Sequence, residues 1–145
     1  MSPHQQRGVF GFPYLLVLIL LAHAALGVIY SLMVPPWEAH DEWGHYSFAE
    51  YLARERHLPP PGTRVIDKAD ESHQPPLYYT LVALTIGWIN TDEGFQPAYN
   101  PYSATEGGSG GANIMIHDPA VEAFPYEGTI LALHTARLVS VVLST

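Results

Sequence analysis

The stretch PPWEAHDEWGHYSFAEYL, residues 35–52, follows directly on an apolar run that is long enough to cross a bilayer. Two prolines end that run, and four polar side chains come soon afterwards: Glu38, Asp41, Glu42 and His45. Proline suits the first turn of a helix, so the stretch predicts a helix near 36–56 that begins at Pro36 or Trp37. Side chains at positions i, i+3, i+4 and i+7 share one face of a helix. We therefore expect an amphipathic juxtamembrane helix whose three carboxylates and imidazole point to the same side.

The apolar run itself, residues 12–34, carries no formal charge. A helix needs about 20 residues to cross a hydrocarbon core of about 30 Å, so this run predicts a transmembrane helix. It exceeds the apolar region of a signal peptide, which favours a retained anchor. Arg7 in the short tail 1–11 favours a cytoplasmic amino terminus and an extracytoplasmic loop over residues 35–128. His23 lies inside the run and predicts a hydrogen bond to another helix, because a polar group is costly at membrane depth.

Two further apolar stretches predict helices. The stretch 77–89 is too short to span, so we expect a juxtamembrane helix near 76–89 that is interfacial, re-entrant or buried. Residues 129–145 are apolar at most positions and indicate the start of a second transmembrane helix, truncated at Thr145. The expected fold class is all-α and integral to the membrane, with one complete transmembrane helix, a loop with two juxtamembrane helices, and the start of a second span. We expect the chain to be the amino-terminal part of a longer multi-pass protein.

Charge and composition narrow the range of partners. The net charge is -8 with His neutral, and all 14 acidic residues lie between Glu38 and Glu127. An acidic segment of this kind argues against nucleic-acid binding, which needs a basic surface. Cysteine is absent, so the chain has neither a disulfide framework nor a thiolate metal site.

The acidic face of the predicted helix near 36–56 has three interpretations. It is a solvated face, a metal site, or the location of a general base. For a metal site, Asp41 and His45 at i and i+4 can reach one divalent ion such as Mg, Mn or Zn. For a general base, the start of a helix favours ionised carboxylates, which suits proton abstraction.

A second motif, HQPPLYY at residues 73–79, also has two interpretations. The structural one is a helix started by proline with tyrosines at the membrane interface. The functional one is a polar rim formed by His73 and Gln74, with Tyr78 lining a lipid groove. Arg137, near the outer end of the last predicted helix, is expected to reach the headgroups or to contact an anionic lipid phosphate.

The order of these motifs resembles the amino-terminal region of bacterial polyprenyl-phosphate-dependent glycosyltransferases. These are the protein-mannosyltransferase-like family 39 enzymes of the GT-C superfamily, which include the aminoarabinose lipid A transferases. The resemblance rests on the spanning run, PPWEAHDEWGHYSFAEYL, HQPPLYYTL and the Arg-Leu-Val-Ser-Val helix start. It covers most of residues 12–145 but only about the first quarter of a typical family member. It implies a multi-pass enzyme of the inner (plasma) membrane that moves a sugar from a polyprenyl-phosphate carrier to a hydroxyl of a lipid, glycan or protein, with inversion.

The resemblance also implies roles for individual residues. Asp41 matches the base that takes the acceptor proton, Glu42 matches its companion, and His45 supports Asp41 or binds a metal. In aminoarabinose transferases a phosphate-contacting Lys precedes the Pro-Pro pair, whereas Gln74 stands here, so another cation must serve. The residues expected to bind substrate are Glu38, His73, Gln74, Tyr78 and Arg137.

The sequence leaves two other functions open. The chain could instead be part of a non-catalytic membrane protein whose acidic, His-bearing loop binds a divalent metal or a partner. It could also be a truncated product without activity. If the chain is instead part of a glycosyltransferase, the fragment alone is expected to be inactive, because it lacks most of any donor cavity.

Overall fold

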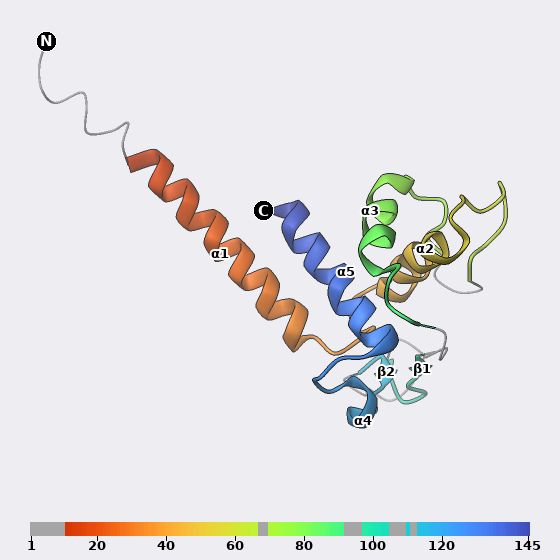
Figure 1. Ribbon diagram of the computed structural model, residues 1–145. Coiled ribbons are helices and arrows are strands. Elements are labelled where there is room, and N and C mark those ends of the chain that lie inside the picture. Colours follow the sequence, from red (N-terminus) through yellow and green to blue (C-terminus); the bar gives the residue numbers. More distant parts are fainter. Residues whose placement is uncertain (1–10, 67–69, 92–96, 105–109, 111–112) are drawn as a thin grey trace, which may run out of the picture.

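The computed structural model describes residues 11–66, 70–91, 97–104, 110 and 113–145. The predicted tail 1–11 lies almost wholly outside these ranges. Among the described residues helices predominate, which confirms the expected mainly helical character (Figure 1). The elements in chain order are α1 (Gly11–Met33), α2 (Glu42–Glu55), α3 (Pro76–Ile86), β1 (Ala98–Tyr99), β2 (Met115–Ile116), α4 (Pro119–Glu122) and α5 (Gly128–Ser144).

Helix α1 is long and apolar enough to cross a membrane. Residues Pro13–Met33 have a mean hydropathy of 2.4 in their most apolar window, and nearly all of their side chains are exposed. The two other apolar helices, α3 and α5, are shorter. The sequence prediction of a helix of spanning length over residues 12–34 is therefore confirmed in position and length.

Helices α1 and α5 pack side by side in antiparallel directions. His23 in α1 lies 3.0 Å from the Ser144 hydroxyl at the far end of α5, which confirms the predicted hydrogen bond to another helix. Gly27 lies against Val141, so close that an added Cβ would stand 2.9 Å from a Val141 methyl carbon. Small residues allow this close approach of two helices in membrane proteins.

The described core lies where α2, α3 and α5 meet. It contains apolar side chains from all three helices that are less than a tenth exposed: Phe48, Ala49, Leu52, Tyr79, Val82, Ile86, Leu133 and Ala136. Burial of several such side chains at about 25 cal/mol per Å² of apolar surface is the main force that holds the group together. This group orients the residues that follow α1.

Helix α2 begins later than the sequence predicts. It starts at Glu42 rather than at Pro36 or Trp37, because the backbone is left-handed at Trp37 (φ 66°) and at Asp41 (φ 58°). A right-handed helix cannot continue through such residues. Trp37 is instead buried, with its ring 5.0 Å from that of Trp43 and 5.1 Å from that of Tyr46.

Because of this late start, the prediction that Glu38, Asp41, Glu42 and His45 share one face of a helix is wrong. Glu38 and Asp41 lie in the turns before α2, and only Glu42 and His45 of the four polar residues belong to the helix. The helix ends at Glu55, one residue before the predicted limit, where Arg56 adopts a left-handed conformation and donates its N–H to the Leu52 carbonyl. Such a left-handed residue is a common helix end.

The second juxtamembrane helix and the final helix occur where the sequence places them. Helix α3 begins at Pro76 and ends at Ile86, with a turn up to Ile89, and α5 covers Gly128–Ser144. The hairpin of β1 and β2 was not predicted. Ala98 pairs with Ile116 in antiparallel register, and two-residue strands carry too short an alternating pattern to be recognised.

Candidate functional site

Arg137 of α5 connects three parts of the chain. Its Nε and Nη2 donate to the Glu42 carboxylate at 2.6 and 2.7 Å. Its Nη1 donates to the carbonyls of Ser31 and Val34 at 3.0 and 2.7 Å, and Nη2 also donates to that of Pro35 at 3.0 Å. A guanidinium has five N–H donors, and these five bonds use all of them. Arg137 thus ties the end of α1 to the start of α2.

The predicted contact between Arg137 and the headgroups or a lipid phosphate is therefore not observed. The guanidinium is buried and points toward the backbone carbonyl of Ser31 in the last turn of α1 and that of Val34 just after the helix. Those carbonyls need donors, and a nearby carboxylate adds charge pairing, so the side chain gains more by turning inward. Glu42 also accepts the Trp37 N–H at 2.8 Å, which fixes the turn that precedes Asp41.

Asp41 is the accessible carboxylate of the predicted set. It stands immediately before α2, its side chain makes no capping bond, and it is 40% exposed with His40 Nε2 at 2.9 Å. A left-handed non-glycine residue costs on the order of 1 kcal/mol, and such strain is often found at functional sites. The structure therefore presents one carboxylate outward at the position expected for the base.

His45 and Tyr79 form a pair that the sequence did not single out. The His45 Nδ1 lies 2.8 Å from the Tyr79 hydroxyl, and the two rings stack at 5.9 Å. Burial, then the nearby charges of Glu71 and Tyr78, raise the pKa of Tyr79 to about 12. The hydroxyl is therefore neutral at physiological pH, and it donates to Nδ1 in the tautomer of His45 that carries its proton on Nε2.

A pocket of about 450 Å³ lies between α2, α3 and α5. Val82, Leu133 and Ala136 contribute its apolar wall. The polar lining comes from His40, Glu42, His45, Tyr46, Tyr78, Tyr79, Arg137 and Ser140. His40 and Glu42, the sequence neighbours of Asp41, line it, whereas Asp41 itself does not. An apolar cavity of this size with a few polar groups is typical of a ligand site.

Tyr78 lines this pocket, as expected for a groove residue, and its hydroxyl lies 2.7 Å from that of Ser140. The other two residues of the predicted polar rim lie elsewhere. His73 is exposed and lines a different hollow beside Pro59–Gly62, and Gln74 donates to Glu71 at 3.1 Å. The structure thus brings Glu42, His45 and Tyr78 together around one pocket, with Asp41 next to Glu42 in the chain and with His73 and Gln74 elsewhere.

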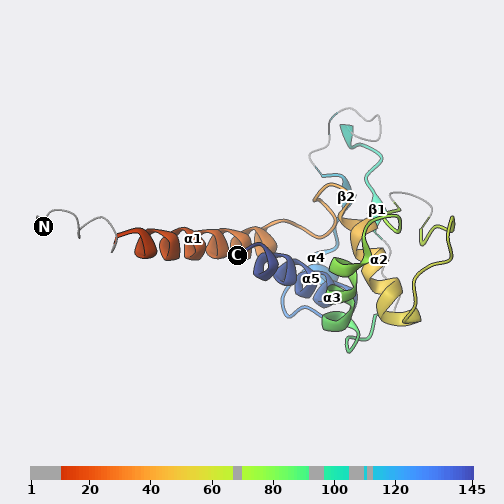
Figure 2. The same ribbon diagram turned by 90° about the horizontal axis from the view of Figure 1, so that it is seen from above.

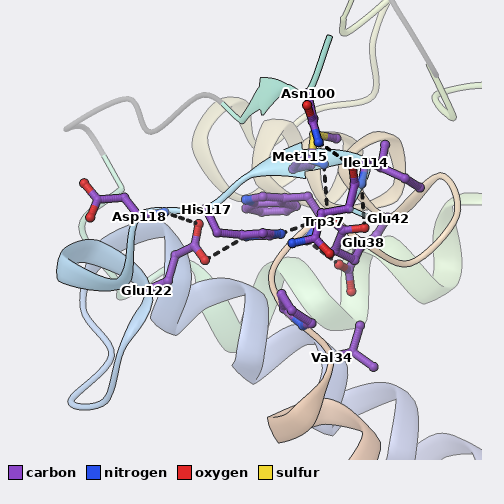
Figure 3. Close-up of polar contacts among 12 residues, drawn as sticks. Val34, Trp37, Glu38, Glu42, Asn100, Ile114, Met115, His117, Asp118 and Glu122 are labelled. Atoms are coloured by element: carbon purple, nitrogen blue, oxygen red, sulfur yellow. Dashed lines mark hydrogen bonds and ion pairs between the residues drawn. The ribbon is translucent and has the colours of Figure 1, made fainter. Parts of the chain in front are cut away.

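Glu38 holds the hairpin against the start of the loop. Figure 3 shows its carboxylate accepting the backbone N–H groups of Ile114 and Met115, at 2.9 and 3.0 Å, and facing His117 Nε2 at 2.8 Å. Burial alone raises the pKa of Glu38, but the bonds from Ile114, Met115 and His117 outweigh it and leave the pKa below its ordinary value. The structure gives Glu38 a structural role, and its predicted role in substrate binding stays a prediction.

His117 links Glu38 to α4. Its Nδ1 lies 2.9 Å from Glu122, so the imidazole stands between two largely buried carboxylates. Because carboxylates only accept hydrogen bonds, both contacts are hydrogen bonds when both ring nitrogens carry protons. Glu38 and His117 are 79 positions apart, so no local sequence signal could pair them.

Among the residues that the structure describes, no group of three or more His, Asp or Glu side chains is arranged to hold a metal ion. The proposed ligands contact other partners, since Asp41 faces His40 and His45 faces Tyr79. A divalent metal at Asp41 and His45 stays a prediction.

No model of a known protein family, no curated protein and no solved structure matches this chain.

Proposed function

We propose that this chain belongs to a membrane glycosyltransferase of the GT-C type, which uses a polyprenyl-phosphate sugar and takes the acceptor proton with Asp41. The observation that carries the proposal is the position of this carboxylate. It is the most exposed of the three predicted carboxylates, it stands in a left-handed turn immediately before α2, and its sequence neighbours His40 and Glu42 line the pocket. A lipid-borne donor requires a site of this kind, where a charged base meets the membrane surface.

The reaction follows from the chemistry of the groups. As the acceptor oxygen forms its bond to the anomeric carbon, its proton passes to the Asp41 carboxylate. The bond between that carbon and the phosphate oxygen breaks, and the polyprenyl phosphate leaves with the bonding electrons. Attack opposite the leaving group inverts the anomeric centre. The acceptor is a lipid, glycan or protein hydroxyl.

His45 and Tyr79 suit the leaving phosphate. His45 lines the pocket and is oriented by the Tyr79 hydroxyl, which keeps a ring N–H available to an anion. Hydrogen-bond donors fixed in advance stabilise developing charge without further reorganisation. Glu42 and Arg137 act as positioning residues, because they set the turn that presents Asp41.

The proposed location is the inner (plasma) membrane, as a multi-pass protein. In this arrangement α1 crosses the bilayer, and the loop 35–128 is extracytoplasmic. The site then faces the side where lipid-linked sugars meet acceptors. The length and apolar surface of α1 support the crossing of a membrane by this helix.

The test is Asp41→Asn in the full-length protein, measured as sugar transfer from a polyprenyl-phosphate donor. Loss of a general base lowers the rate by about 10²–10⁴-fold. Glu55→Gln is the control, because Glu55 is also an accessible carboxylate and lies at the far end of α2. Membrane insertion is checked for both variants. Full activity of Asp41→Asn would overturn the assignment.

The alternative function is binding of a divalent metal or a partner by the acidic loop. Calorimetry with Mn or Zn distinguishes it from glycosyl transfer. Tight metal binding that Asp41→Asn removes, in a protein whose transfer activity is absent, favours that alternative.

A further inference from the structure

Helix α3 has an apolar stripe on its outer side. Leu77, Leu81 and Leu84 are 73, 38 and 75% exposed, and Trp88 in the following turn is 73% exposed. Their spacing of i, i+4, i+7 and i+11 places them along one line of a helix. No described element covers this α3 stripe. Contiguous exposed apolar patches are rare on folded proteins and mark interaction sites.

The opposite side of α3 fixes which way the stripe points. Tyr79, Val82 and Ile86 are buried in the core shared with α2 and α5. Figures 1 and 2 show α3 at the edge of this helical group. The α3 stripe therefore points away from the rest of the described chain.

The depth of α3 relative to α1 identifies the surroundings of the stripe. Tyr78 in the first turn of α3 is hydrogen-bonded to Ser140, the neighbour of Val141, which packs on Gly27 of α1. Gly27 lies six residues before Met33, the last residue of α1. At about 1.5 Å per residue, the start of α3 is thus level with a point about 9 Å inside the end of α1.

Interfacial helices bury their apolar face by about 5–10 Å in the boundary between headgroups and acyl chains. We propose that the α3 stripe inserts into the outer leaflet of the bilayer, with lipid as its occupant. This placement rests on α1 spanning the membrane, as in the proposed function, but not on any glycosyl transfer. Of the three positions that the sequence allows for this helix, interfacial, re-entrant or buried, the proposal selects the interfacial one.

The charges beside the stripe agree with a lipid surface. Leu84 lines a hollow with Arg56 and His57, and none of the described residues that line it is acidic. Basic side chains near an apolar insertion favour anionic headgroups. Trp88 lies at the carboxyl end of the stripe, and tryptophan collects at the headgroup level.

The chain contains no cysteine, so single spin labels test the depth of the stripe directly. Leu77→Cys and Leu84→Cys carry a nitroxide in the full chain, reconstituted in vesicles of phosphatidylethanolamine and phosphatidylglycerol. Collision with oxygen, which concentrates in lipid, is compared with collision with a water-soluble nickel chelate. Leu18→Cys in the exposed middle of α1 is the lipid reference, and Glu55→Cys at the exposed end of α2 is the water reference.

The expected result is that labels at 77 and 84 meet oxygen more than nickel, as at 18, while the label at 55 shows the reverse. Preferential contact with nickel at 77 and 84 would place the stripe in water and overturn the proposal. Shielding from both reagents would show a protein neighbour in place of lipid and also overturn it. If the label at 18 meets nickel as well, α1 does not span, and that failure is distinguished from failure of the stripe alone.

Discussion

Arg137 and Glu42 are 95 positions apart, yet they form a two-point ion pair with N–O distances of 2.6 and 2.7 Å. The pair is largely buried, and the same guanidinium also binds the last carbonyls of α1. One side chain therefore joins the helix of spanning length to the helix whose first turn presents Asp41. The site and the end of the span are a single structural unit.

Arg137→Lys is expected to destabilise the protein, because an ammonium cannot make the fork of contacts to Glu42 and to the α1 carbonyls. Breaking a buried pair by removal of one partner costs about 3–5 kcal/mol, and Lys should recover part of this. The free energy of unfolding in detergent is measured for Arg137→Lys, Glu42→Gln and the double variant. The two changes should be strongly non-additive. Additive losses would show that the pair does not act as one unit.

Glu38 makes the stability depend on acid. Its pKa is below its ordinary value of 4.5 in the folded chain, so the folded state binds fewer protons than the unfolded state. This contribution is fully present above the unfolded pKa and is lost as the pH falls through the lower folded pKa. The unfolding temperature of the wild type should therefore decrease as the pH is lowered past about 4.5. Glu38→Gln should have a lower unfolding temperature at neutral pH and should lose less of it in acid.

Glu55→Gln is the control for this titration, because its carboxylate is exposed and lies far from the hairpin. It should retain the wild-type pH profile. An unchanged profile for Glu38→Gln would show that other carboxylates cause the acid sensitivity.

The contact between Gly27 and Val141 predicts a paired substitution effect. Gly27→Ala places a Cβ 2.9 Å from a Val141 methyl carbon, which forces α1 and α5 apart. Overpacking costs about 1–3 kcal/mol, and the higher helix propensity of Ala returns about 1 kcal/mol. Thermal unfolding should thus show a net loss in the wild-type background. In a Val141→Ala background the same substitution should be neutral or stabilising, and an equal loss in both would exclude this contact as its cause.

The sequence predicted elements whose signal is local. The apolar run of α1, the proline start of α3 and the apolar α5 were located within a few residues, because length and hydropathy determine them. The late start of α2 could not be predicted, since burial of Trp37 among Trp43 and Tyr46 overrides the preference of proline for a first helical turn. That burial depends on tertiary packing.

The sequence also predicted only the part of the candidate site whose signal is local. Asp41 and His45 belong to a recognisable motif, and the structure places His45 in the lining of the pocket and Asp41 in the turn before α2. The partners that define their surroundings are distant in sequence: Tyr79 is 34 positions from His45, and Arg137 is 95 from Glu42. Pairings of this kind appear only once helices α2, α3 and α5 are packed together.

Tyr79→Phe tests whether the His45 pair serves the proposed transfer. The substitution keeps the ring that packs on Phe48 at 4.6 Å and removes only the hydroxyl that orients His45. If His45 faces the leaving phosphate, loss of its orienting partner should lower kcat by about 10–100-fold, with little change in the unfolding temperature. Tyr51→Phe, which removes a tyrosine hydroxyl of α2 that lies 3.5 Å from His57 and outside this pocket, is the matched control and should retain more activity. His45→Gln combined with Tyr79→Phe should be no slower than His45→Gln alone, because the hydroxyl acts only through the imidazole. A further loss in the double variant would mean that Tyr79 contacts the substrate itself.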